Sequence, residues 1–82
     1  MYFVYILNSK NSQKYYVGQT GNLEKRIKEH NDRKVSFTKR FMPWELKLQI
    51  IKQTRTEALI LERKLKNLNQ EDLIAFIRKY SV

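Results

Sequence analysis

Residues 15–31, YYVGQTGNLEKRIKEHN, combine three side chains of different chemistry. They include the phenol of Tyr16, the guanidinium of Arg26 and the imidazole of His30, the only histidine in the chain. A guanidinium presents a fork of donors that matches two phosphate oxygens at once. An imidazole can take up a proton near neutral pH, and a phenol can do so if its pKa falls from about 10. This combination fits phosphodiester hydrolysis, in which an attacking water loses a proton beside the negatively charged phosphoryl group.

Two residues outside this segment complete a set of candidates. Glu62 carries a carboxylate, and magnesium sites often use one or two carboxylates together with water and phosphate. We expect Arg26 to bind phosphate and Glu62 to hold the metal, with either Tyr16 or His30 moving the proton. We expect Tyr5 to orient the water or the phosphate.

Each candidate also has an ordinary structural interpretation. Tyrosine is common in strands, and an arginine often lays its stem on apolar surface. A histidine near the C-terminal end of a helix is electrostatically favourable. Glu62 and Lys66 have the spacing of an ion pair on one helix face. The residues taken singly leave both interpretations open.

Secondary-structure patterns indicate how these residues are positioned. Residues 2–7 and 15–18 read as strands, joined by a polar turn, so that a hairpin would bring Tyr5 and Tyr16 together. Residues 23–31 read as a helix capped by Asn22. On that helix Arg26 and His30 lie beside the apolar edge, whereas its lysines point to water.

The second half of the chain predicts one more strand and two helices. Residues 32–44 read as a basic loop, and residues 45–51 as a strand with Leu46, Leu48 and Ile50 on one face. A helix over residues 55–68 begins with the capping-box pair Thr54 and Glu57. The core stripe of this helix is Ala58, Leu61, Leu65 and Leu68. A final helix is expected over residues 70–80, capped by Asn69. Its inward-facing residues are expected to be Leu73, Phe76, Ile77 and Tyr80.

The order β-β-α-β-α-α predicts an α+β fold, an α/β sandwich in which helices pack on a small, mostly antiparallel sheet. With 82 residues, the chain is expected to form a single domain over residues 1–82. The absence of cysteine excludes disulfides and thiolate metal sites. No stretch approaches the roughly 20 apolar residues of a membrane span. We expect a cytoplasmic protein, without a membrane or an organic cofactor, and favour a monomer.

The charge favours a polyanionic partner. Seventeen Lys and Arg against eight Asp and Glu give a net charge of +9 and a pI of about 10.0. Such an excess is typical of nucleic-acid-binding domains, although a basic surface can be incidental. The side chains expected to contact nucleic acid are Lys14, Gln19, Arg33, Lys34, Lys39 and Arg40.

Four ordered blocks, VYIL, YVGQT, LEKRIKEHN and EALILERKLK, together resemble the GIY-YIG nuclease domain, most closely its short stand-alone bacterial members. The resemblance spans residues 2–66 and implies a three-stranded antiparallel sheet flanked by helices. It also implies one-step hydrolysis of a DNA phosphodiester with one divalent ion, Mg²⁺ or Mn²⁺. The residues that match the family's site are Tyr5, Tyr16, Arg26, His30 and, as the metal ligand, Glu62.

The chain departs from the family pattern in three places. The first tripeptide, residues 3–5, lacks its glycine. Gln19 stands where some family nucleases carry a basic residue. Asn67 and Asn69 are both candidates for an active-site asparagine that follows the glutamate helix in many members. The alternatives to a nuclease are a basic nucleic-acid-binding module with weak or no cleavage, and an interaction domain whose charge is incidental.

Overall fold

The sheet of this protein has three antiparallel strands in the order β2-β1-β3. The computed structural model describes residues 1–32, 34, 35 and 37–81. The strands are β1 (Tyr2–Ser9), β2 (Tyr15–Thr20) and β3 (Trp44–Lys52), and the first strand is central. The helices are α1 (Leu23–Asn31), α2 (Arg55–Lys66) and α3 (Gln70–Tyr80), with a short 3-10 helix η1 (Thr38–Phe41). The predicted α+β order is confirmed.

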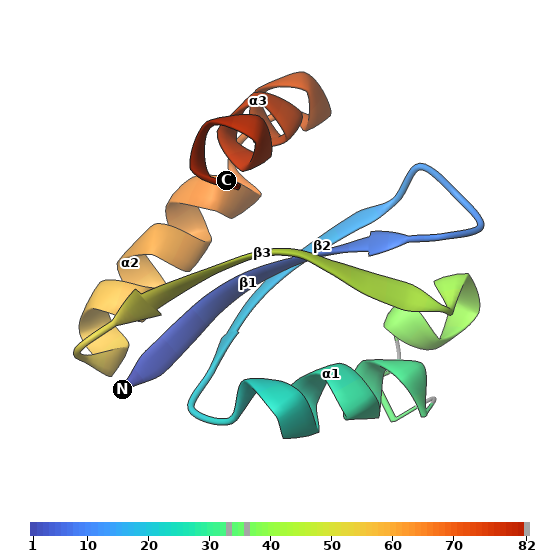
Figure 1. The fold of residues 1–82 in the computed structure, drawn as a ribbon, viewed down its shortest axis with the longest axis horizontal. Coiled ribbons are helices and arrows are strands. Elements are labelled where there is room, and N and C mark those ends of the chain that lie inside the picture. The colour runs from blue at the N-terminus through green and yellow to red at the C-terminus, as the bar shows by residue number, and fades with distance from the viewer. Residues whose placement is uncertain (33, 36, 82) are drawn as a thin grey trace.

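Helices cover both faces of this sheet (Figure 1). Side chains alternate between the faces of a strand, so β1 contributes to two cores. Val4 and Ile6 belong to the core that contains α2 and α3, whereas Tyr5 and Leu7 pack with Trp44 on the α1 side. Burial on both faces explains why β1 is a continuous apolar and aromatic run.

The predicted helix starts are confirmed by their capping contacts. The Asn22 side chain accepts a hydrogen bond from the Lys25 backbone N–H at 3.1 Å, and Asn69 does the same for Asp72 at 2.8 Å. Thr54 and Glu57 form the reciprocal capping box. These capping contacts determine where α1 and α2 begin, and therefore where Arg26 and Glu62 lie along their helices.

Strand β3 corrects one prediction. The register between β1 and β3 shifts between Ile6 and Leu7. Leu48 and Ile50 therefore pack with the α2–α3 core, while Leu46 packs with the α1 core. The expectation that all three side chains share one face was wrong for Leu46, because an extra residue in a strand reverses the alternation beyond it.

The structure corrects two further predictions, one for Tyr80 and one for the segment that precedes β3. Tyr80 was expected to face inward, but it is 50% exposed and its ring lies 4.6 Å from that of Phe76. The segment expected to be entirely loop contains the helix η1, and Arg33 within it lies outside the described residues. None of the helices in the described ranges has the length and hydrophobicity needed to span a bilayer.

Candidate active site

The hairpin places two phenols on the α1 face of the sheet. Tyr5 pairs with Gly18, and Leu7 pairs with Tyr16, so both tyrosines point to the same side. Their ring centroids are 6.4 Å apart, which confirms the predicted proximity. Tyr5 is only 1% exposed, whereas Tyr16 is half-buried at the edge strand. Of the two phenols, Tyr16 is therefore the one that a ligand can reach.

Gly18 makes room for the ring of Tyr5. A Cβ atom built at Gly18 would lie 2.6 Å from Tyr5 Cζ and closer still to the hydroxyl. The ring cannot move aside easily, because it is buried and its hydroxyl is hydrogen-bonded to His30. No glycine of this chain has a positive φ, so Gly18 is not needed for an unusual backbone conformation. It is needed because the Tyr5 ring packs directly against its Cα.

We expect Gly18→Ala to destabilise the protein by about 1–3 kcal/mol, the usual cost of overpacking a core. Gly21→Ala is the matched control, since a Cβ there meets nothing closer than Tyr2 Cε1 at 3.6 Å. Urea unfolding of the two variants measures the difference. Equal stability of both variants would show that Tyr5 is not held in place as described.

Helix α1 presents Arg26 and His30 to the sheet, as its pattern predicted. His30 is fully buried, Arg26 is half-buried, and Lys25 and Lys28 are exposed. The Tyr5 hydroxyl lies 2.9 Å from His30 Nε2, and the ring of Tyr16 packs 4.7 Å from the imidazole. The imidazole therefore lies behind both phenols and has no exposed surface of its own.

Thr38, which was not predicted, holds the other side of the imidazole. Its hydroxyl is 2.9 Å from His30 Nδ1 and donates to the Val35 carbonyl oxygen at 3.3 Å. A hydroxyl has one proton to donate, so Nδ1 donates to Thr38 and Nε2 accepts from Tyr5. Trp44 Nε1 anchors this turn by donating to the Thr38 carbonyl oxygen at 2.7 Å. The result is a buried chain of hydrogen bonds from Tyr5 through His30 to Thr38.

The pKa values of Tyr5 and His30 agree with this assignment of hydrogen-bond donors and acceptors. Burial, together with the charge of Arg26, lowers the pKa of His30 to about 4, while the charge of Glu29 opposes the shift. Burial raises the pKa of Tyr5 to about 12, although the adjacent Arg26 guanidinium opposes this. At neutral pH the imidazole is uncharged and Tyr5 keeps its proton.

Acid is expected to destabilise the fold through His30. Its pKa is lowered on folding from 6.5 to about 4, so the unfolded chain binds the proton more readily. Stability is therefore complete above pH 6.5 and is lost as the pH falls toward 4, by up to about 3 kcal/mol.

His30→Gln is the variant that tests this pH dependence. It should be less stable than the natural chain at pH 7 and show a shallower loss of stability between pH 6.5 and 4. Urea unfolding at several pH values gives the free energy of unfolding of both proteins as a function of pH. Subtracting one curve from the other removes the contribution of the carboxyl groups, which both proteins share. Parallel curves would contradict the buried, neutral imidazole.

Arg26 and Glu62 influence Tyr5 from two helices, α1 and α2, that pack on opposite faces of the sheet. The charges of Arg26 and Glu62 and the phenol of Tyr16 all act on the Tyr5 hydroxyl. Burial lowers the pKa of Arg26, but its contacts with Tyr5 and Glu29 outweigh this effect and raise the pKa overall. Arg26 Nη1 lies 3.1 Å from Glu29 Oε1. Side chains from β1, β2, α1 and α2 thus converge at one edge of the sheet.

Glu62 pairs with Lys66, the alternative that their spacing left open. Its Oε2 atom lies 3.3 Å from Lys66 Nζ, and this ammonium is 6.0 Å from the centre of the Tyr16 ring. No cluster of three or more His, Cys, Asp or Glu exists among the described residues. A divalent ion here would therefore bind one carboxylate and complete its shell with water and phosphate, an oxygen set that suits magnesium.

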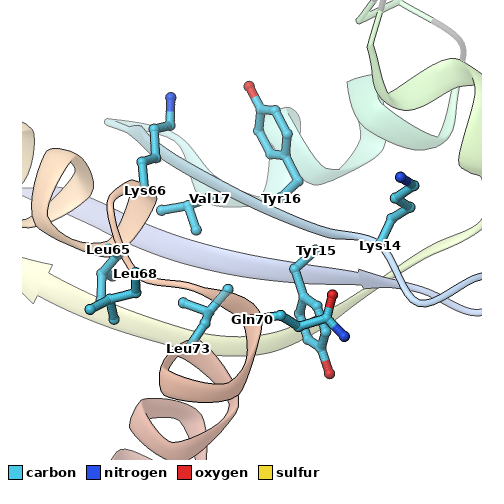
Figure 2. Close-up of a pocket in the computed structure, with 9 residues that line it drawn as sticks. All are labelled: Lys14, Tyr15, Tyr16, Val17, Leu65, Lys66, Leu68, Gln70 and Leu73. Atoms are coloured by element: carbon cyan, nitrogen blue, oxygen red, sulfur yellow. The ribbon is translucent and has the colours of Figure 1, made fainter.

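The remaining predicted residues fall into three groups. Lys14 lines a groove of about 340 Å³ together with Tyr16 and Lys66, and this groove is here called the Lys66 groove. Figure 2 shows that the Tyr16 hydroxyl and the Lys66 ammonium extend to the same side of β2. Gln19 lines a second groove, of about 500 Å³, with Arg26 and Arg55, here called the Arg55 groove. The other predicted residues, Lys34, Lys39, Arg40, Asn67 and Asn69, are exposed, and Asn69 is occupied in capping α3.

The fold and this edge together define a small α+β domain with tyrosine, arginine and glutamate side chains gathered at one edge of its sheet. The chain belongs to the GIY-YIG family, since the model of the GIY-YIG catalytic domain matches residues 1–79. The resemblance inferred from the four sequence blocks is thereby confirmed. Membership places the chain in a family of nucleases.

A solved structure shows the same fold. It is the solution NMR structure of the UPF0213 protein BH0048 from Bacillus halodurans, with 29% sequence identity and a TM-score of 0.57. The similarity covers 92% of this chain and 83% of that one. A search of curated proteins finds no match.

Proposed function

We propose that this protein is a divalent-metal-dependent endonuclease that hydrolyses DNA phosphodiester bonds in one step. The observation that carries the proposal is the grouping of Tyr5, Tyr16, Arg26 and Glu62. The two tyrosine rings lie 6.4 Å apart, and Lys66 lies beside both the Tyr16 ring and the Glu62 carboxylate. The charges of Arg26 and Glu62 both act on Tyr5. These side chains come from separate elements, and each suits one requirement of phosphoryl transfer. Nucleic acid as the substrate is supported by the net charge of +9.

The exposure of the side chains suggests how they divide the work. Tyr16 is accessible, so we assign it the proton of the attacking water. To accept this proton Tyr16 must first release its own proton to solvent, and the Lys66 ammonium near its ring would stabilise the resulting phenolate. Tyr5 and His30 are at most 1% exposed, so we assign them to positioning Tyr16 and Arg26. The prediction that His30 could itself be the base fits this burial less well.

The reaction then follows from these positions. The water oxygen forms a bond to phosphorus as the bond to the leaving oxygen breaks, and the water proton passes to the Tyr16 oxygen, which has first released its own proton to solvent. The Arg26 guanidinium binds two nonbridging phosphoryl oxygens. Glu62 would hold one ion, Mg²⁺ or Mn²⁺, which when bound supplies charge that offsets the charge on the leaving oxygen. We further propose that the protein acts in the cytoplasm as a monomer.

Two observations favour a second function, a nucleic-acid-binding module with weak or no cleavage. The Glu62 carboxylate is paired with Lys66, so a metal ion would have to compete with this ammonium. Gln19 also provides no charge at a position where some family nucleases carry a basic residue. This function would use the same grooves without any metal.

Cleavage of an end-labelled panel separates the two functions. The panel contains duplex, single-stranded, flapped and four-way DNA together with RNA, each incubated with Mg²⁺, with Mn²⁺ or with EDTA at low salt. Metal-dependent products are expected, and the panel would identify the substrate. Salt-sensitive binding without products under any condition would replace the proposed nuclease with the binding module.

A further inference from the structure

The Arg55 groove and the Lys66 groove lie at opposite ends of one seam between β2 and α2. The Arg55 groove contacts the C-terminal end of β2, at Gln19, and the first residue of α2. The Lys66 groove contacts the N-terminal end of β2, at Tyr15 and Tyr16, and the last residue of α2. Strand and helix therefore run in opposite directions along this seam, and both grooves are lined by both elements.

The candidate active site lies between these two grooves. Arg26 lines the Arg55 groove, Tyr16 lines the Lys66 groove, and Glu62 lies between Arg55 and Lys66 along α2. Eleven helical steps from Arg55 to Lys66 correspond to about 16 Å at about 1.5 Å per residue. At a rise of about 3.4 Å per phosphate, as in one strand of B-DNA, this length matches about five phosphate-to-phosphate steps.

The charge of both grooves is predominantly positive. The Arg55 groove has the cationic side chains of Lys25, Arg26 and Arg55 and the carboxylate of Glu29. The Lys66 groove has Lys14 and Lys66, and no carboxylate lines it among the residues that the structure describes.

Several of these cations are available to a ligand. Within the described part of the chain, no carboxylate lies within ion-pair distance of Lys14, Lys25 or Arg55. Lys14 Nζ lies 5.6 Å from the centre of the Phe41 ring, a contact that leaves its charge uncompensated. Phosphate groups would supply the missing negative charge at both ends of the seam.

We infer that one strand of nucleic acid lies along the β2–α2 seam, with the scissile phosphate between the two grooves. Lys25 and Arg55 bind phosphates on one side of the cleaved bond, and Lys14 and Lys66 bind them on the other. This inference rests on the proposed function and specifies how its substrate is held. It places the main contacts on the seam rather than on the basic segment that contains Lys39 and Arg40.

Fluorescence anisotropy with a labelled DNA oligonucleotide tests this path. The full chain is used in EDTA, which leaves the side chains unchanged and prevents metal-dependent cleavage. The seam variant is Lys14→Gln with Arg55→Gln, and the loop variant is Lys39→Gln with Arg40→Gln. The control, with the same loss of charge on exposed residues outside both grooves, is Lys28→Gln with Lys79→Gln.

The seam variant is expected to bind about 10-fold more weakly than the control. Its salt dependence should also fall by about 1.5 in slope, at about 0.7–0.9 per lost phosphate contact. All the changed residues are exposed, and circular dichroism confirms that each variant is folded. Equal affinity of the seam variant and the control, or a larger loss in the loop variant, would overturn the seam while leaving cleavage by the natural chain intact. Absence of both binding and cleavage in the natural chain would instead remove the proposed function.

Discussion

Replacing Tyr16 with phenylalanine is expected to lower the cleavage rate by about 100-fold or more, because general base catalysis contributes about 10²–10⁴-fold. The ring would still pack 4.7 Å from the imidazole of His30, so the fold should survive the loss of one oxygen atom. DNA affinity should change less than about 3-fold, since phosphate contacts dominate binding. Single-turnover cleavage and anisotropy measure the two quantities separately.

Tyr80→Phe is the matched control for this substitution. Tyr80 is exposed on α3 and lines neither the Arg55 groove nor the Lys66 groove. The control should cleave at close to the natural rate. A greater loss of activity in a folded His30→Gln variant than in Tyr16→Phe would assign the proton to the imidazole and contradict the role of Tyr16.

Replacing Arg26 with lysine is expected to reduce cleavage by about 100-fold even though the charge is retained. The guanidinium lies beside the Tyr5 hydroxyl and is held by Glu29, so its fork points into the Arg55 groove from a fixed position. A lysine would present a single ammonium to the phosphate and lose the geometric match to two oxygens. Removing one such preorganised donor typically costs about 10²–10³ in rate.

Arg78→Lys is the control for that exchange, since Arg78 is exposed on α3 and lines neither groove. Cleavage rates at saturating DNA compare the two variants without interference from affinity. If Arg26→Lys cleaves as fast as the control, Arg26 contributes only charge and the proposed binding of two phosphoryl oxygens is wrong.

Local sequence signals were enough to predict the order of the elements and part of the candidate site. Asn22 and the pair Thr54 and Glu57 mark helix starts through contacts within one turn, so neighbouring residues suffice to place them. Four-residue spacing on α1 likewise put Arg26 and His30 on its sheet-facing side. Periodicity reports which face of an element is buried, and that was sufficient for these residues.

Tertiary contacts account for what the sequence did not predict. The reversal at Leu46 depends on how β3 pairs with β1, and no local pattern records a register shift. Thr38 contacts His30 in a position where Trp44 Nε1 also holds the Thr38 carbonyl oxygen, so neither residue type nor spacing identified it. In the sequence, Arg55 is marked only as the first residue of a predicted helix. Its place beside Gln19 and Arg26 follows from the packing of α2 along β2.

The same packing explains the contrast between the two tyrosines of the motif. Tyr5 lies on the central strand, under α1, and takes part in a buried chain of hydrogen bonds. Tyr16 lies on the edge strand and keeps its hydroxyl accessible. One hairpin thus provides both a rigid support and, in the proposed mechanism, the group that meets the substrate.

The most direct test of the proposed catalysis compares the natural chain with Glu62→Gln, prepared side by side so that a contaminating nuclease would appear in both. The amide keeps the size of the side chain and removes the charge that would hold the metal. We predict that the natural chain cleaves DNA in Mg²⁺ and not in EDTA, and that Glu62→Gln binds DNA but cleaves at least about 100-fold more slowly. Equal cleavage by both proteins, or none by either, would contradict a metal-dependent active site at Glu62.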